Sequence, residues 1–138
     1  MKPAYVLDAC ALIAYLTDEP GVEVVERHLL QATGGTALVY MHKLNLLEVY
    51  YGFLRSGGKA RADEMLHDIA ESGIEIIENL ADPVFQEAGR LKALYRISLA
   101  DSVALAEAVQ KNAAILTSDH HEFDIVQRNE PIQFEWIR

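Results

Sequence analysis

Cysteine is almost absent from this chain, and long apolar runs are missing altogether. Cys10 is the single cysteine among 138 residues, so the chain has no internal disulfide and no zinc site built on paired cysteines. We therefore expect a reducing, cytoplasmic compartment. No apolar run approaches the roughly 20 residues of a membrane-spanning helix, and the first one, Ala4–Leu7, stops at Asp8, too early for a signal peptide. The sequence thus predicts neither a membrane span nor export.

Positive charge is also scarce. The chain has 12 lysine and arginine residues against 21 aspartate and glutamate residues, which gives a formal net charge of −9. This balance argues against a protein that holds nucleic acid through a broad basic face. It is compatible with a protein that meets phosphate through bound divalent cations, and it suits a basic protein partner.

The chain does contain enough apolar residues for one folded domain. With 138 residues, of which 51% are hydrophobic, it can bury about 68–70% of its extended surface, so we predict a single domain over residues 1–138. Continuous apolar runs of strand length are typical of parallel strands covered on both faces, and an alternating run is typical of an edge strand. The four continuous runs and the alternating fifth are Ala4–Leu7, Ala37–Tyr40, Ile74–Ile77, Ala113–Leu116 and Ile132–Ile137.

Between these runs the apolar residues have helical spacing. The predicted helices are Ala9–Leu16, Gly21–Gln31, Lys43–Arg55, Lys59–Glu71, Asp82–Tyr95 and Asp101–Asn112. Gly57-Gly58 is expected to end the third helix. Strands that alternate with helices predict an α/β fold with a mostly parallel sheet and helices on both of its faces.

Acidic residues stand where such a fold binds ligands. In open α/β sheets, ligands bind beyond the carboxyl ends of the strands. Asp8 follows the first predicted strand, and Thr117-Ser118-Asp119 ends the fourth. Each acid also has a purely structural explanation, because aspartate is a common helix N-cap and Asp119 with Glu122 fits a capping box.

Glu48 is harder to explain by local structure. On a helical wheel it falls in the middle of an apolar stripe. If that stripe faces the core, the carboxylate costs several kcal/mol unless it is paired, neutralised or bound to metal. Arg55 lies about 10 Å along the helix axis, which makes it a poor partner, and a side chain that reaches the helix edge is the structural alternative. The apolar members of the stripe are Leu44, Leu47, Tyr51 and Leu54.

Asp101 is a fourth acid at the boundary of an element, in the segment Ser98–Ser102 where a helix begins. The N-cap explanation applies here too, although Ala104 supplies no capping-box partner. Four acids at strand ends, helix starts and an apolar stripe are hard to explain as separate caps. Carboxylates that converge in one pocket repel each other, and a hard divalent cation is the usual compensation. Oxygen ligands without paired Cys or His residues favour Mg²⁺ or Mn²⁺ over zinc.

Four segments of the sequence resemble, in order, the four motifs of the PIN-domain family. They are Tyr5–Ala14, Asn45–Gly52, Ser98–Ala106, and Leu116–Asp119 followed by Phe123. Each motif is short, but the ordered set spans nearly the whole chain. The length and the second motif are most similar to the VapC-type toxins of toxin–antitoxin pairs.

The resemblance implies a magnesium-dependent endoribonuclease with a three-layer fold, in which helices flank a sheet of about five mostly parallel strands. Carried over by position, Asp8, Glu48, Asp101 and Asp119 form the acidic quartet of the family. Asp8 and Asp101 are then the principal metal ligands. Glu48 binds metal or holds its water, and Asp119 acts directly or through water.

The implied reaction is hydrolysis of an RNA phosphodiester to a 5′ phosphate and a 3′ hydroxyl. A bound ion lowers the pKa of a water molecule, and a second ion would stabilise the leaving oxygen. Thr117 and Ser118 are candidates for hydrogen bonds to the water shell. The family also implies a homodimer and a small antitoxin. The apolar segments Val22–Leu30 and Leu46–Leu54 are candidates for an antitoxin groove, with core packing as the simpler alternative.

Other residues near the motifs have weaker assignments. His120, His121 and Asp124 follow the fourth motif, where a role at the substrate or metal competes with ordinary surface exposure. Cys10 stands where the family commonly has a hydroxyl or amide group, and because a thiol is a weaker donor we expect a packing role. Candidate phosphate contacts, with solvated helix surface as the alternative, are Lys43, Arg90, Lys92 and Arg96.

Three other protein classes share some of these features. A PIN-like scaffold without catalysis is the main alternative, and the complete quartet argues against it. A phosphoacceptor receiver domain needs a paired acid after the first strand and a lysine after the last, and neither Asp8-Ala9 nor Trp136-Ile137-Arg138 provides them. A haloacid-dehalogenase-like phosphatase needs a second aspartate two residues after Asp8, where Cys10 stands.

Overall fold

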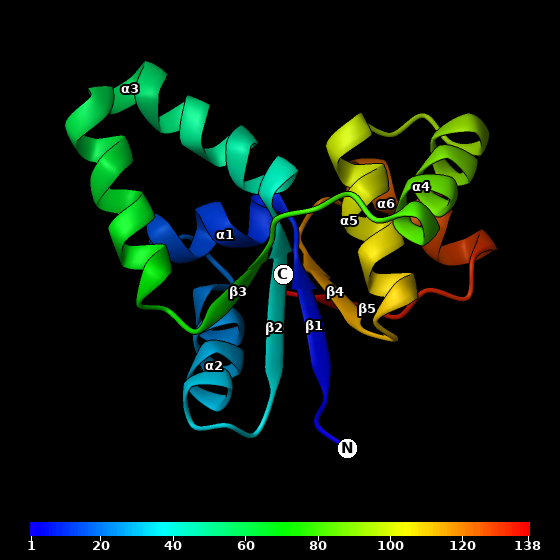
Figure 1. Cartoon of the computed structure of the whole chain (residues 1–138), viewed down its shortest axis with the longest axis horizontal. Coiled ribbons are helices and arrows are strands. Elements are labelled where there is room, and N and C mark those ends of the chain that lie inside the picture. Colours follow the sequence, from blue (N-terminus) through cyan, green and yellow to red (C-terminus); the bar gives the residue numbers. More distant parts are fainter.

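A sheet of five parallel strands forms the centre of the molecule. The computed structural model describes all residues 1–138, and the strands lie in the order β3-β2-β1-β4-β5 (Figure 1). This confirms the predicted parallel sheet, with the alternating fifth strand at one edge. The strands are β1 (Ala4–Leu7), β2 (Leu38–His42), β3 (Ile74–Ile77), β4 (Ala114–Thr117) and β5 (Phe134–Trp136).

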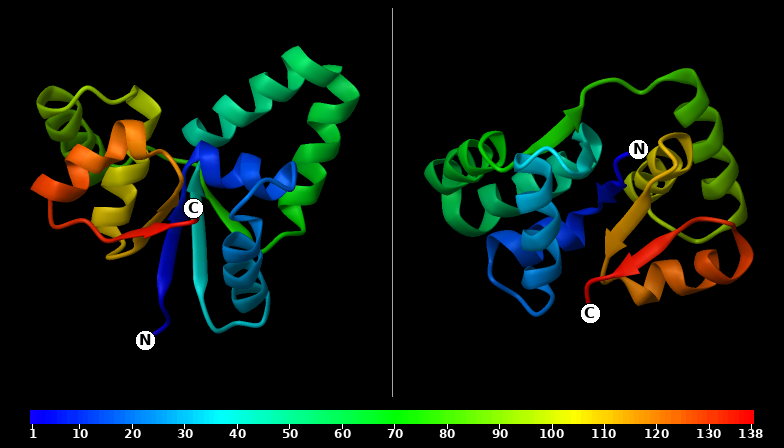
Figure 2. Two further views of the ribbon diagram at one scale, coloured as in Figure 1. Left: turned by 180° about the vertical axis from the view of Figure 1, so that it is seen from behind. Right: turned by 90° about the horizontal axis from the view of Figure 1, so that it is seen from below.

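Helices cover both faces of the sheet, which gives three layers (Figure 2). One face carries α1 (Ala9–Leu16), α2 (Val22–Thr33) and α3 (Lys43–Ala70), and the other carries α4 (Asp82–Leu94), α5 (Leu99–Gln110) and α6 (His120–Asn129). None of the six helices combines the length and the apolar composition that crossing a membrane requires.

The two layers of core alternate along the central strands, as the pleat of a sheet dictates. Leu7 and Leu116 pack in the cluster beneath α1, α2 and α3, whereas Val6 and Ile115 pack in the cluster beneath α5 and α6. Because both faces are buried, β1 and β4 need apolar residues at every position. That requirement explains their continuous apolar sequences.

Helix α6 was not among the predicted helices. Only two of its ten residues, Phe123 and Val126, are buried, so its apolar periodicity is too short to show in the sequence. The local signal is its cap: Asp119 precedes the helix, and its carboxylate accepts the backbone N–H of Glu122 at 3.1 Å. The capping-box pattern was therefore the available evidence for this helix.

The segment Lys43–Ala70 consists of two helical halves. Gly58 interrupts it with a φ of 80° and a ψ of −179°, which lies in a region that essentially only glycine occupies. The two halves meet at this kink and arch over α1 (Figure 1). The predicted break at Gly57-Gly58 is confirmed.

The first half of α3 presents a different face to the core than the helical wheel suggested. The residues expected to face inward are largely exposed: Leu47 by 52%, Tyr51 by 47% and Leu54 by 37%. The buried face consists of Asn45, Leu46 and Val49 instead. The prediction of a core-facing stripe around Glu48 is therefore wrong. Periodicity identifies an apolar face, but it does not tell whether the core or another surface covers that face.

The order of the strands creates one topological switch point. From β1 the chain first builds β2 and β3 on one side, and later places β4 and β5 on the other. The chain segments that follow the neighbouring strands β1 and β4 therefore run apart, toward α1 and α6 on opposite faces of the sheet. In α/β sheets this switch point is where ligands bind, and here Asp8 and the segment Thr117–Asp119 stand at it.

We expect opposite effects from alanine at two glycines of α3. A Cβ added at Gly58 or at Gly52 meets no atom within 4 Å, so only backbone conformation distinguishes the two sites. Gly58→Ala should lower the free energy of unfolding by about 1–3 kcal/mol, because alanine is strained at this φ and ψ. Gly52→Ala, inside a regular helix, should raise it by about 0.5–1 kcal/mol. Urea unfolding measures both, and a Gly58→Ala variant as stable as the wild type would contradict the kinked geometry.

Candidate metal centre

Asp8 is fixed by two hydrogen bonds at the switch point. One carboxylate oxygen, Oδ1, accepts the backbone N–H of Ala11 at 2.8 Å and so caps α1. The other, Oδ2, accepts the hydroxyl of Thr117 from the end of β4. Asp8 is 1% exposed and Thr117 is fully buried. The carboxylate is therefore held rigidly between two neighbouring strands, with lone pairs left over on both oxygens.

Thr117 also positions the next acid. Its Oγ1 accepts the backbone N–H of Asp119 at 3.0 Å, while its hydroxyl proton goes to Asp8. Asp119 in turn caps α6. One threonine thus connects Asp8 and Asp119, and its hydroxyl is hydrogen-bonded in both directions. Ser118, its neighbour, is partly exposed beside it.

Asp101 lies in the first turn of α5, but it is not the N-cap. Ser98 is the cap, and its Oγ accepts the backbone N–H of Asp101 at 3.1 Å. In a capping box the acid at this third position would bond back to the N–H of the cap. That N–H instead donates to Oε2 of Glu122 at 2.9 Å. The N-cap alternative for Asp101 is therefore wrong, and its carboxylate lies beside that of Glu122 instead.

Glu48 reaches the same region from α3. It is partly buried, and its pKa is raised by burial and by the charge of Glu122. One turn earlier, Asn45 is fully buried, and its Nδ2 donates to the backbone oxygen of Ala100 at 3.0 Å. The N-terminal part of α3 is thus joined to the start of α5, next to Asp101.

Five acids lie near one another at this switch point. Asp101, Asp119 and Glu122 each offer a carboxylate oxygen within 4.8 Å of the other two. Burial is the main cause that raises the pKa of Asp8, and the charges of Asp119 and Glu48 raise it further. For Asp101, burial and a hydrogen bond with Glu122 come first, and the charge of Asp8 adds to them. The structure therefore brings together all four acids that the sequence singled out.

Glu122 is the member of the cluster that sequence reasoning missed. Its spacing from Asp119 fits a capping box, but the N–H of Asp119 is bonded to Thr117, so no bond from Glu122 is needed there. Its carboxylate crosses to Ser98 instead and lies beside Asp101. Its position three residues after Asp119 was the only signal, and that signal fits both roles.

Burial, helped by the neighbouring carboxylates, raises the pKa values of Asp8 and Asp101 in this cluster. Burial is the main cause that raises the pKa of Asp8 to about 7. Burial, a hydrogen bond with Glu122 and the charge of Asp8 raise the pKa of Asp101 to about 8. A hard divalent cation would compensate the negative charge of such a cluster of oxygen donors. The donor set fits Mg²⁺ or Mn²⁺.

Cys10 lies beside the acids but keeps its proton. Burial, followed by the charges of the surrounding carboxylates, raises the pKa of its thiol to about 12. It is partly buried.

The residues after Asp119 that were considered for the site are engaged with each other. His120 contacts Oδ1 of Asp124 through Nδ1 at 2.9 Å and the backbone oxygen of Arg138 through Nε2 at 3.0 Å. Its ring stacks on Trp136 with 3.8 Å between the centroids. His121 is exposed. These contacts point His120 and Asp124 toward β5.

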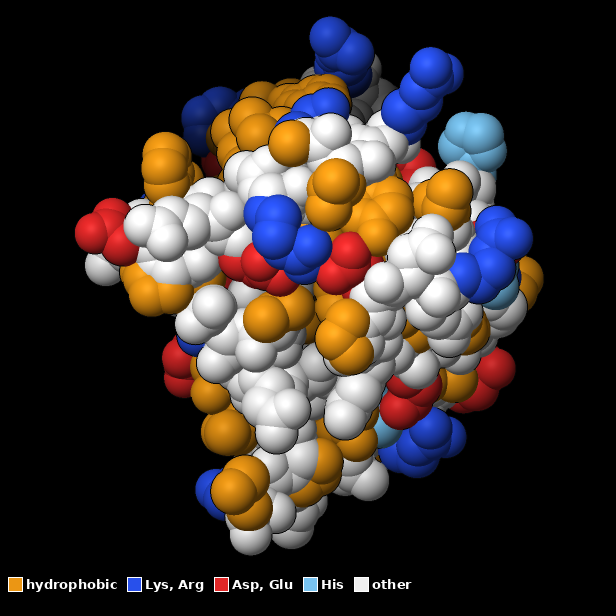
Figure 3. Space-filling view, turned by 90° about the vertical axis from the view of Figure 1, so that its right-hand side faces the viewer, with side chains coloured by type: hydrophobic (Ala, Val, Ile, Leu, Met, Phe, Trp, Pro, Cys, Tyr) orange, Lys and Arg blue, Asp and Glu red, His pale blue; other side chains and the backbone are white.

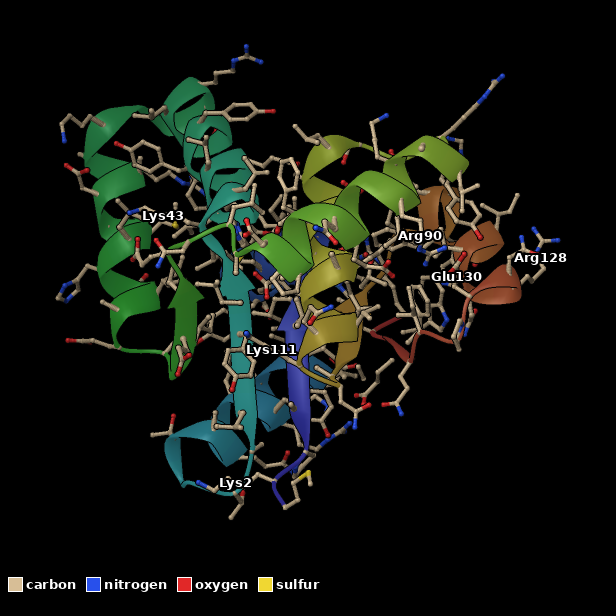
Figure 4. The ribbon with its side chains drawn as sticks, turned by 45° about the vertical axis from the view of Figure 1, so that its right-hand side comes forward. Lys2, Lys43, Arg90, Lys111, Arg128 and Glu130 are labelled. Atoms are coloured by element: carbon tan, nitrogen blue, oxygen red, sulfur yellow. The ribbon has the colours of Figure 1, made fainter.

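The basic residues do not form a continuous surface. Lys43 is paired with Glu78 at 2.8 Å, and Arg90 is paired with Glu130 at 2.7 Å (Figure 4). On the face shown in Figure 3, basic side chains are scattered among acidic and apolar ones. Of the four candidate phosphate contacts, only Lys92 and Arg96 are exposed without an ion pair.

The chain belongs to the PIN-domain family, whose model matches residues 5–129. This confirms the resemblance seen in the four motifs. No curated protein sequence shows a significant match.

Solved structures of VapBC complexes and VapC proteins have the same fold. VapBC2 from Rickettsia felis, bound to a promoter DNA fragment, is 20% identical with a TM-score of 0.75 over 96% of this chain and 98% of that one. DNA-bound VapBC from Salmonella typhimurium is 17% identical with a TM-score of 0.76 over the whole of both chains. VapC20 from Mycobacterium tuberculosis, described as a toxin that cleaves the sarcin–ricin loop, is 12% identical with a TM-score of 0.64 over 91% and 95%.

The raised pKa values predict how pH affects the stability of the metal-free protein. Asp101 has a pKa of about 8 in the folded protein against 3.8 as its ordinary value. Between about pH 4 and pH 8 the folded state therefore holds more protons than the unfolded state, and stability falls as the pH rises. Asp101→Asn removes this titration. In chelator at pH 8 the variant should be more stable than the wild type, and the difference should shrink toward pH 4.

Urea unfolding across this pH range measures the effect. Glu26→Gln is the matched control, because it removes one carboxylate from the exposed side of α2. Equal pH dependence in the wild type and in Asp101→Asn would show that the folded state does not hold the extra proton at this site.

Proposed function

We propose that this chain is a divalent-metal-dependent endoribonuclease and the toxin of a toxin–antitoxin pair. The observation that carries the proposal is the convergence of five carboxylates at the switch point of a PIN fold, with the pKa values of Asp8 and Asp101 raised to about 7 and about 8. The RNA-cleaving description of VapC20 supports RNA as the substrate class. We also propose that the protein acts on this substrate in the cytoplasm.

Asp8 and Asp101 are the proposed principal ligands of Mg²⁺ or Mn²⁺, and Glu48, Asp119 and Glu122 complete the acidic shell directly or through water. A divalent ion bound here supplies a Lewis acid that lowers the pKa of water and offsets negative charge on the phosphodiester. The expected products carry a 5′ phosphate and a 3′ hydroxyl.

The residues around the acids provide order and complementary charge. The hydrogen bonds of Asp8 to Thr117 and to the N–H of Ala11 hold its carboxylate in one orientation. Four of the five acids, all except Glu48, stand at the N-termini of α1, α5 and α6, where the helix dipoles favour negative charge on side chains and on a substrate phosphate. Arg96 is exposed and has no ion pair. It lies two residues before Ser98 and is the unpaired cation closest in sequence to Asp101, so we propose it as a phosphate contact.

Purified protein should cleave a mixed-sequence RNA oligonucleotide in Mg²⁺, leaving 5′-phosphate and 3′-hydroxyl ends, and excess chelator should abolish the reaction. Asp8→Asn and Asp101→Asn should each lower the rate by more than about 100-fold, since even groups behind metal ligands are worth 10–100-fold. Asp124→Asn removes an acid of α6 that lies outside the cluster, and it should retain activity.

Mapping of RNA ends by sequencing measures the result. Ends that appear equally with the wild type and both ligand variants would point to a contaminating nuclease. Metal binding without any cleavage would instead favour a PIN-like binding module.

We further propose that an antitoxin covers the apolar face of α3. Lys43 and five apolar residues from both halves of the helix line a groove of about 500 Å³. The exposed side chains of Tyr51 and Leu54 extend this surface. The similarity to VapBC complexes supports such a partner, and the net charge of −9 favours a basic one. The apolar lining residues are Leu44, Leu46, Leu47, Tyr50 and Leu66.

Leu66→Glu should therefore abolish capture of the small protein encoded beside this chain and leave RNA cleavage intact. A carboxylate buried in an apolar contact costs several kcal/mol, which corresponds to a loss of affinity of at least about 100-fold. Leu30→Glu, on the more polar groove beside α2, is the matched control and should bind normally.

Co-expression followed by light scattering distinguishes the partners. A homodimer, which we also propose, should persist in Leu66→Glu. If that variant becomes monomeric and still binds the antitoxin, the groove belongs to the second copy of the chain. Loss of binding in Leu30→Glu alone would assign the antitoxin to α2.

A further inference from the structure

Asn45 is a buried polar residue whose hydrogen-bonding capacity is half used. It is fully buried in the first turn of α3, and its Nδ2 donates to the backbone oxygen of Ala100 at 3.0 Å. Its Oδ1 has no donor, and it is the only buried side-chain nitrogen or oxygen in the structure without a partner. An isolated exception of this kind requires an explanation.

The orientation of the amide follows from its neighbour. Turning the amide over would place Oδ1 against the carbonyl oxygen of Ala100, and two acceptors repel each other. The observed orientation is therefore the better one, and it still leaves Oδ1 without a donor. An asparagine at this position therefore leaves its side-chain oxygen without a hydrogen-bond donor.

Stability does not account for this asparagine. Ala100 is the second residue of α5, so its carbonyl has the regular helical partner four residues on, and the bond from Asn45 is an additional one. A buried acceptor without a donor costs as much as or more than such a bond contributes. An apolar residue of the same branched shape, such as leucine, would need no hydrogen-bond partner at all.

The place of Asn45 in the chain suggests what the side chain does. Asn45 precedes Glu48 by three residues, and Ala100 directly precedes Asp101. The bond between Asn45 and Ala100 is the only side-chain hydrogen bond between α3 and α5. The other connections among the acids run through Thr117 and Glu122 and do not include α3. Without Asn45, Glu48 has no polar tie to the rest of the cluster.

We infer that Asn45 is a positioning residue, which fixes Glu48 against Asp101 through the carbonyl of Ala100. This polar side chain lowers the stability of the core, and it serves the alignment of the site. The inference rests on the proposed metal centre, since it assigns Asn45 to the alignment of two of its acids. Asn45 itself is not placed as a ligand.

The test compares stability and metal binding in Asn45→Leu. In chelator, the melting temperature of the variant should equal or exceed that of the wild type. Its affinity for Mn²⁺, measured by the electron paramagnetic resonance signal of free Mn²⁺, should fall by about 10–100-fold, as is usual when a group that orients metal ligands is removed. Raising Mn²⁺ to saturation should then restore much of the RNA cleavage.

Val49→Ala is the matched control. Val49 is buried on the same helix but packs in the layer of α1 and α2, so this variant should melt earlier and bind Mn²⁺ like the wild type. Equal Mn²⁺ affinity of Asn45→Leu and the wild type would overturn the inference, as would a clear drop in melting temperature or an equal affinity loss in Val49→Ala. Failure of the wild type itself to bind Mn²⁺ would instead overturn the proposed function.

Discussion

Mutual repulsion among carboxylates is the constraint around which this molecule is organised. Asp101, Asp119 and Glu122 stand within 4.8 Å of one another, and Asp8 beside them is almost fully buried. An arrangement of this kind tends to spread apart unless the backbone holds it. The sheet does so by placing the ends of β1 and β4 side by side, and the N-termini of α1, α5 and α6 add partial positive charges at the same point.

The capping role and the proposed ligand role of these acids are not competing explanations. Asp8 and Asp119 each cap a helix with one oxygen, and a carboxylate with two oxygens retains acceptor capacity for a metal. Capping fixes the direction in which the remaining lone pairs point. Asp101 differs, because Ser98 caps α5 in its place by accepting the backbone N–H of Asp101. The backbone N–H of Ser98, which Asp101 would bond in a capping box, donates to Glu122 instead. The geometry of the site is thus built from ordinary helix-start chemistry.

This overlap explains how much could be predicted from sequence. Strand positions, the parallel sheet and the glycine break were predictable, because buried parallel strands need continuous apolar residues and Gly58 adopts a conformation that other residues avoid. Asp8 and Asp119 were predictable from the ends of those strands. The environment of Glu48 was not, since an exposed apolar face has the same periodicity as a buried one. Glu122 was missed because its partner, Ser98, lies 24 residues away, and sequence spacing carries no information about such contacts.

The acidic composition and a phosphate-bearing substrate become compatible once protons are included. With a pKa of about 7 for Asp8 and about 8 for Asp101, the metal-free cluster carries fewer negative charges at neutral pH than its composition suggests. A divalent ion would displace these protons, so metal uptake releases protons and strengthens as the pH rises. Under the proposed function, this acidic protein would need no broad basic face to meet RNA, because the positive charge would arrive with the metal at the place where the fold concentrates the acids.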